Sequence, residues 1–195
     1  MLEEMKNVCW KSINKVIINV MCLVLGSSFS ESAFTFEDCS DNATAIFQVN
    51  NFTVEPDPID LTNNVSITAN IELLKSITSN FVLDTRYFRL TRVFGYSLDI
   101  PIPCIASKYG SCTLPACMYL ESFQRNVCPF FPNEIECKCP VEEGFYGGEN
   151  VQIRIAYIPL IGRFFVKGRY RTELRIKEMT NETEVACFKI FTELD

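Results

Sequence analysis

Residues 104–139 read CIASKYGSCTLPACMYLESFQRNVCPFFPNEIECKC and hold six of the ten cysteines of the chain. Cys137 and Cys139 do not bridge to each other easily, because one intervening residue in an extended chain sends both side chains to the same side. Spacing favours a nested pattern, which pairs Cys128 with Cys137, Cys117 with Cys139 and Cys104 with Cys112, and leaves Cys39 for Cys187. About 105 connectivities are open to eight cysteines, so this pattern is a hypothesis that spacing favours without proving.

The first thirty residues have the layout of a secretory signal peptide. Lys6, Lys11 and Lys15 precede an apolar run at 16–25, which small residues follow at 26–28. The run is shorter than the roughly 20 apolar residues that span a bilayer, which argues against a signal anchor. Removal of 1–30 takes away two cysteines and leaves eight, the even number expected of an oxidised secreted domain. We therefore expect a removed signal peptide at 1–30 and one domain at 31–195.

Residue types exclude several kinds of site. The chain has no histidine, which excludes Ser-His-Asp and Cys-His catalysis, His-ligated zinc and a histidine pH switch. A metal site made of cysteines alone is the alternative, but paired thiols are the usual state in a secreted protein. We expect no catalytic residue and no metal. Acceptors for N-glycosylation stand at Asn42, Asn51, Asn64 and Asn181.

Short segments of alternating apolar and polar residues fill most of the chain after the signal. The alternation is clearest at 65–73 and 169–177, where it predicts half-buried strands. Further strands are expected at 34–39, 44–54, 81–94, 96–103, 146–157 and 184–192, because Pro, Gly or Asn clusters bound each segment. One short helix is expected from about Pro115 to Phe123. The sequence thus predicts an antiparallel all-β domain of seven or eight strands with one helix in the disulfide-rich block.

Charge is segregated along the chain. Residues 27–74 contain eight acidic and no basic residues, whereas 154–177 contain seven basic residues and one acidic residue, Glu173. Solvated strand faces explain such a pattern, and so does a surface that meets anionic lipid headgroups. Because the chain is acidic overall, with a net charge of −6 and a pI of about 4.9, we do not expect a nucleic-acid partner.

An apolar segment interrupts this basic region. Residues 158–168 read IPLIGRFFVKG, and proline and two glycines there predict a loop, which is normally polar. Its apolar side chains either fold into the core or form an exposed patch for membrane or ligand contact. In the second case Arg163 and Lys167 would reach phosphates or acidic headgroups. The segment VFGYSL at 93–98 is similar in kind, and an ordinary strand turn is the simpler interpretation there.

Several short sequence motifs in the chain resemble motifs of the MD-2-related lipid-recognition (ML) family. They are FTFEDC at 34–39, EPDPI at 55–59, NVS at 64–66, IPC at 102–104, YGSCT at 109–113, CP at 128–129, CKCP at 137–140, GFY at 144–146, GRYR at 168–171 and CFKI at 187–190. The resemblance runs from residue 34 to the C-terminus, and it is strongest to members that present gangliosides to glycosidases. It implies an eight-stranded antiparallel β-cup, of the immunoglobulin-like sandwich type, around an apolar lipid cavity.

The resemblance also implies roles for individual residues. The four nested cysteine pairs are those of the family, and Asn64 corresponds to its glycosylation acceptor. The rim loops of the family correspond to 93–98 and 158–166, which makes the expected lipid and membrane contacts Val93, Phe94, Tyr96, Leu98, Ile158, Leu160, Ile161, Phe164, Phe165 and Val166. Two features depart from the family: the only tryptophan is Trp10, in the signal, and one extra residue separates Cys104 from Cys112.

The expected function is that of a lysosomal or extracellular activator without enzymatic activity, acting in ganglioside catabolism. It would extract a glycosphingolipid from a membrane and present it to a soluble glycosidase of the β-N-acetylhexosaminidase type, with no cofactor besides the bound lipid. A general secreted carrier of sterols, fatty acids or other lipids is the main alternative. A lipid hydrolase is disfavoured by the lack of histidine, since Glu142 and Glu143 look like solvated turn residues. A disulfide-rich interaction module without a ligand is the last alternative.

Overall fold

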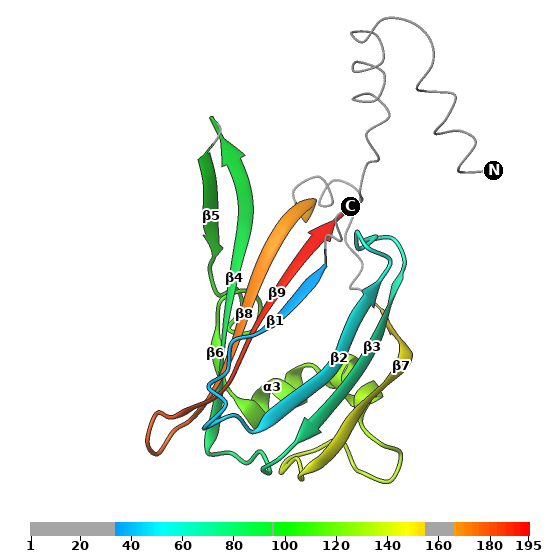
Figure 1. The fold of residues 1–195 in the computed structure, drawn as a ribbon, viewed down its shortest axis with the longest axis vertical. Helices are drawn as coiled ribbons and strands as arrows, with labels where there is room; N and C mark the ends of the chain where they lie inside the picture. The colour runs from blue at the N-terminus through cyan, green and yellow to red at the C-terminus, as the bar shows by residue number, and fades with distance from the viewer. Residues whose placement is uncertain (1–33, 95, 155–165) are drawn as a thin grey trace, which may run out of the picture. The chain divides into compact units, whose positions relative to one another are not determined.

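Two antiparallel sheets make up the fold (Figure 1). The computed structural model describes residues 34–94, 96–154 and 166–195, so the expected signal peptide lies outside the described residues. The larger sheet has the order β1-β9-β8-β4-β5, with β6 paired to β4, and the smaller has the order β2-β3-β7. The strands are β1 (Thr35–Asp38), β2 (Phe47–Glu55), β3 (Asn64–Leu73), β4 (Phe81–Val93), β5 (Tyr96–Ile102), β6 (Thr113–Pro115), β7 (Gly144–Arg154), β8 (Gly168–Glu178) and β9 (Glu184–Leu194). All strand pairs in these sheets are antiparallel.

The strands follow from alternation, and the small departures from the expected ranges have local causes. The structure has nine described strands where eight were expected, and the additional one is the three-residue β6 in the disulfide-rich block. Strand β2 begins at Phe47 rather than 44, because the backbone N–H groups of Thr44 and Ala45 donate to the carbonyl of Asp41 in a turn. The expected all-β class with two sheets is confirmed.

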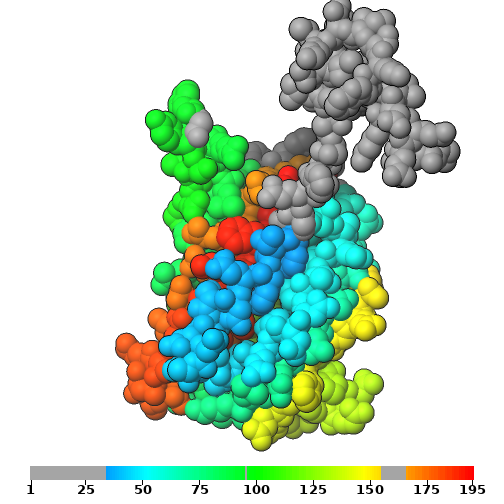
Figure 2. Space-filling model, viewed as in Figure 1, coloured from blue at the N-terminus to red at the C-terminus, as the bar shows by residue number. Residues whose placement is uncertain are grey.

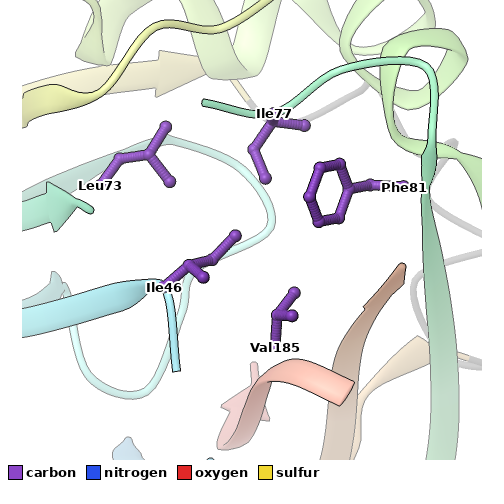
Figure 3. Packing of buried hydrophobic residues seen from close by; sticks show 5 residues of the cluster. All are labelled: Ile46, Leu73, Ile77, Phe81 and Val185. Carbon is purple, nitrogen blue, oxygen red and sulfur yellow. The ribbon is translucent and has the colours of Figure 1, made fainter. Parts of the chain in front are cut away.

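A compact hydrophobic core lies where β2, β4 and β9 begin and β3 ends (Figure 3). Ile46, Leu73, Ile77, Phe81 and Val185 point toward one another from five different segments of the chain. Phe81, at the start of β4, is only 2% exposed. A fully buried phenylalanine contributes about 1.5–3 kcal/mol relative to an exposed one, so this cluster fixes how the two sheets meet.

The disulfide-rich block bridges the sheets at this end. It contains α3 (Ala116–Ser122), α4 (Gln124–Val127) and the 3₁₀ helix η1 (Cys128–Phe130). Helix α3 packs on β4 and β6 of the larger sheet, whereas α4 and η1 pack on β7 of the smaller sheet. Proline at 115 immediately precedes α3, as expected, because the first turn of a helix needs no backbone donor there.

Four disulfides hold the block and the sheet edge. They join Cys39 to Cys187, Cys104 to Cys112, Cys117 to Cys139 and Cys128 to Cys137, the same pairs that spacing favoured. Two of them close the loops that carry α3, α4 and η1. A cross-linked loop loses conformational entropy when unfolded, which stabilises the folded state by about 2–4 kcal/mol per bridge. The block can therefore keep short helices that would be marginal alone.

Basic residues of β8 lie among acidic partners from neighbouring strands. Arg171 is 2.6 Å from Asp99 of β5, and Arg175 is 2.8 Å from Glu184 of β9. Glu173 lies between these arginines, 3.3 Å from the first. The basic region at 154–177 is therefore not a free cationic surface along β8. Of the two interpretations of the charge pattern, the structure favours a solvated, ion-paired strand face.

Candidate functional site

A cavity of about 370 Å³ lies between the two sheets. The larger sheet contributes side chains from β1, β4, β8 and β9, and the smaller sheet contributes side chains from all three of its strands. The lining residues from these strands are Phe36, Phe47, Val49, Phe52, Ala69, Ile71, Leu73, Leu83, Tyr146, Leu174, Ile176, Phe188 and Ile190. None of the lining residues is charged. A cavity of this character binds the hydrocarbon part of a ligand.

The disulfide-rich block forms part of the cavity wall. Helix α3 contributes Ala116, Tyr119 and Leu120, and the segment from α4 onward contributes Asn126, Val127, Phe130 and Phe131. Ile77 and Val141, which pair in an isolated bridge, complete the wall. The block therefore does more than stabilise the fold through its disulfides, because its helices supply side chains that a bound ligand would contact.

Aromatic side chains close the gap between the sheets beside β1 and β2. The ring centroid of Phe36 lies 5.4 Å from that of Phe52 and 5.5 Å from that of Phe188. Phe47 meets Phe188 edge to face at 6.1 Å. Ring pairs at these separations add about 0.5–1.5 kcal/mol beyond the burial of their area. They hold the two sheets together through side-chain contacts beside β1 and β2.

The polar residues that line the cavity are Tyr119, Asn126 and Tyr146, whereas Tyr87 lies near Tyr119 but does not line it. The hydroxyl of Tyr146 donates to the carbonyl of Glu142 at 2.6 Å. Burial raises the pKa of Tyr119, and the nearby phenol of Tyr87 raises it further. Burial also raises the pKa of Tyr87 itself. These phenols therefore stay neutral in any physiological compartment.

The β4–β5 hairpin exposes apolar side chains at its tip. Phe94 is 96% exposed and Tyr96 is 76% exposed, and Figure 2 shows this hairpin projecting past the neighbouring strands. Of the eleven large apolar side chains exposed in the described part of the chain, seven lie at 93–109. In the strand register Leu98 faces Thr91 and Ile100 faces Arg89. These apolar side chains therefore lie on the same face of the sheet as the cavity wall of β4.

Only part of the predicted contact set can be placed. Ile158, Leu160, Ile161, Arg163, Phe164 and Phe165 lie outside the described residues. The carbonyl of Val166 accepts a hydrogen bond from the Tyr170 hydroxyl. Lys167 donates from Nζ to Asp195 at 2.9 Å, and that carboxylate competes with any lipid headgroup for the ammonium. The structure thus brings Val93, Phe94, Tyr96 and Leu98 together on one hairpin, near the described start of β8.

The four glycosylation acceptors are all accessible. Asn42 and Asn181 lie in exposed turns, and Asn51 and Asn64 are exposed on β2 and β3. Asn51 is in register with Asn70 on the face of the smaller sheet that points away from the cavity. A glycan at Asn51 would therefore lie on the side of the smaller sheet away from the cavity.

The cavity wall itself was missed by reasoning from the sequence. Alternation at 65–73 and 169–177 marks the inward side chains of β3 and β8, but it does not say which of them border empty space and which pack in the core. The contribution of α3 had no local signal, since Tyr119 is one of many aromatic residues in the chain. Only the relation between distant segments reveals it.

In the portions at 34–94, 96–154 and 166–195, no helix is long and apolar enough to span a membrane. The same portions hold no group of three or more His, Cys, Asp or Glu side chains placed to bind a metal ion.

Comparisons with known proteins give one family match and a structural likeness. A family model described as the ML domain matches residues 33–194. A crystal structure of a Niemann-Pick type C2 protein from the Japanese carpenter ant is similar, with 12% identity and a TM-score of 0.41. That alignment covers 83% of this chain and 99% of the ant protein. No curated protein matches the chain.

Proposed function

Since this chain belongs to the ML-domain family and is a lipid-binding protein on that ground, we propose that it is a secreted activator of glycosphingolipid breakdown. In this function it withdraws a ganglioside from a membrane, holds the lipid tail in the cavity, and leaves the sugar accessible to a soluble β-N-acetylhexosaminidase. The protein itself catalyses nothing. The short sequence motifs that resemble the family are most similar to those of the ganglioside GM2 activator protein. For this reason we prefer a ganglioside as the lipid and a β-N-acetylhexosaminidase as the partner.

One observation carries the proposal: an uncharged apolar cavity lies on the same sheet face as an exposed apolar hairpin. The hairpin provides a contact with the bilayer, and the cavity provides a destination for the tail. Burial of a tail stabilises the complex by about 0.8 kcal/mol for each methylene taken from water. Transfer from a bilayer to an apolar cavity is close to neutral by the same measure, and such an exchange suits a carrier that must also release its lipid.

A liposome assay tests this function. Purified β-N-acetylhexosaminidase is given vesicles that contain labelled ganglioside, with and without this protein, and sugar release is measured. We expect release only when both proteins are present. Release by this protein alone would show that it is a hydrolase, and equal release with and without it would refute an activator role.

Two variants at neighbouring positions make the assay specific for the cavity. Ala69 lines the cavity and is 4% exposed, whereas Asn70 is exposed on the opposite face of β3. Ala69→Phe places a ring in the cavity and should abolish stimulation, because the tail then has no space. Asn70→Phe adds the same ring outside and should retain it. Thermal unfolding of both variants verifies that they fold.

The size of the cavity favours a second candidate, a carrier of a smaller lipid such as a sterol or a single fatty chain. Its volume of about 370 Å³ is near the lower end of the range for small-molecule sites, roughly 300–1,000 Å³. Native mass spectrometry of the secreted protein distinguishes the two candidates. A co-purified two-chain glycolipid supports the activator, and a co-purified sterol or single-chain lipid supports the carrier.

A further inference from the structure

A surface groove follows the seam between β1 and β2. The two strands lie side by side (Figure 1) but belong to different sheets. In the described part of the chain each is the outermost strand of its sheet and pairs on one side only, β1 with β9 and β2 with β3. The groove has a volume of about 590 Å³ and is lined by residues 34–36, 49–55 and Asp57. It therefore runs along the free edges of both strands.

Three side chains border both this groove and the lipid cavity. Phe36 of β1 lines each of the two spaces, and so do Val49 and Phe52 of β2. Phe36 and Phe52 are half-buried, and their ring centroids lie 5.4 Å apart. Phe34 lines the groove but not the cavity, and its ring centroid lies 5.8 Å from that of Phe52. A thin layer of side chains, mainly aromatic rings, therefore separates the cavity from the groove.

Backbone hydrogen bonds connect the two sheets at the ends of the seam. At one end the N–H of Ile46 donates to the carbonyl of Val185 at 3.0 Å. At the other end the N–H of Ile59 donates to the carbonyl of Glu193 at 2.8 Å. Between these ends aromatic rings connect β1 to β2. Rings can turn aside by rotation about χ1, whereas parting two paired strands breaks several backbone hydrogen bonds. An opening at the seam therefore costs less than an opening within either sheet.

The course of β2 is irregular beside the same rings. Its register against β3 shifts between Val49 and Asn51, and a bulge of this kind bends a strand and interrupts its pairing. Strand β1 is held more firmly, because the disulfide between Cys39 and Cys187 ties the end of β1 to β9. Movement at the seam is therefore expected on the side of β2.

We propose that the seam between β1 and β2 is a lateral entrance to the cavity, through which a hydrocarbon chain passes between Phe36 and Phe52. The rings close the entrance in the structure described here and turn aside when a chain enters or leaves. This inference rests on the proposed function only in requiring that the cavity takes up a hydrocarbon chain. It applies equally to a ganglioside and to a smaller lipid.

Exchange kinetics of diphenylhexatriene, an apolar probe that fluoresces in apolar surroundings, test the entrance. Stopped-flow mixing of probe with the purified protein gives the association rate constant, and release into excess cyclodextrin gives the dissociation rate constant. Phe34→Ala is the decisive variant, because it removes a ring that packs on Phe52 and leaves the cavity wall intact. We expect both rate constants to rise together, about 2- to 10-fold for the loss of one ring pair, with Kd unchanged. A merely structural role for Phe34 would not speed entry.

Two variants of the cavity wall complete the comparison. Phe52→Ala removes both ring pairs that Phe52 forms, and we expect it to raise the association rate constant about 5- to 100-fold. Phe131→Ala is the matched control, because Phe131 lines the cavity but not the groove and its ring pairs with that of Tyr146 at 5.0 Å. We expect this control to release the probe faster while its association rate constant stays within about twofold of wild type.

The outcomes separate the entrance from the proposed function. If wild type takes up the probe but Phe34→Ala enters no faster, or Phe131→Ala speeds entry equally, the entrance is overturned while lipid binding stands. Entry past the β4–β5 hairpin alone would give the first of these results. If wild type takes up no probe, both the entrance and the proposed function are overturned. Thermal unfolding verifies that each variant folds, and Phe34→Ala decides the matter if Phe52→Ala does not fold.

Discussion

Replacing Phe94 by serine should weaken membrane binding without weakening the fold. Phe94 stands at the tip of the β4–β5 hairpin and is 96% exposed. Its side chain therefore makes almost no contact that folding depends on, and surface substitutions of this kind change the free energy of unfolding by about 0.5 kcal/mol or less. In a bilayer the same ring would become buried.

The magnitude follows from this difference in exposure. Full burial of a phenylalanine side chain contributes about 1.5–3 kcal/mol, and each 1.4 kcal/mol is about a tenfold change in an equilibrium constant. Phe94→Ser should therefore lower the vesicle partition coefficient about 10- to 100-fold if the ring enters the hydrocarbon region. Shallow interfacial contact would place the effect at the lower end of this range.

Cosedimentation with sucrose-loaded anionic vesicles measures the partition coefficient, and urea unfolding measures stability. Phe145→Ser is the matched control, because Phe145 is 63% exposed but lies on the outer face of the smaller sheet, away from the hairpin. We expect this control to bind vesicles as wild type does. Wild-type binding by Phe94→Ser, or an equal loss in Phe145→Ser, would refute the assignment of the hairpin as the membrane contact.

Three further predictions concern the fold itself. Phe81→Ala should lower the free energy of unfolding by about 3–5 kcal/mol in urea titrations, because a 2% exposed ring leaves a cavity in the core; a loss below 1 kcal/mol would contradict that packing. Gly147 has a φ of +141° and a Cβ there would collide with the backbone of β3, so Gly147→Ala should destabilise by about 1–3 kcal/mol. Gly144→Ala, where a Cβ meets nothing, should cost less by thermal unfolding, and the reverse order would contradict the collision. The pKa values of Tyr87 and Tyr119 are raised in the folded state, so their contribution to stability is complete below pH 10 and is lost as pH rises above it, because only the unfolded phenols then ionise. Unfolding at pH 9 and 11 measures this, and a protein equally stable at both would contradict it.

Local sequence patterns were sufficient to predict the strands and which side chains of each strand face inward. Alternation at 169–177 correctly predicted β8, and the side chains of Leu174 and Ile176 do face inward. The pattern succeeds because side chains of a strand alternate with a period of two, whatever the strand pairs with. The same pattern did not predict which charged residues form ion pairs. Arg171 is near Asp99, 72 residues earlier in the chain, and only the register of β4, β5 and β8 brings them together.

The disulfide-rich block shows where local reasoning ends. Cysteine spacing favoured four pairs, and the structure has them. One short helix was expected from about Pro115, and the structure has α3 there but also the short helices α4 and η1, which the sequence did not predict. Spacing did not predict that α3 would line the cavity. This depends on how α3 packs on β4, and that packing is set by contacts far apart in the sequence.

The sequence by itself determined the all-β class, the strand faces and the family. Each of these can be recognised in the linear chain, either from the periodicity of apolar residues or from short sequence motifs. The family resemblance implied an apolar cavity, but the tertiary structure alone decided its size, which of the inward side chains border it, and which surface arginines are already paired. The physical reason is that strand alternation is a property of neighbours in sequence. A cavity is a space between two sheets, and its size depends on how β2, β3 and β7 are held against β4, β8 and β9 by the core around Phe81 and by the disulfide-rich block.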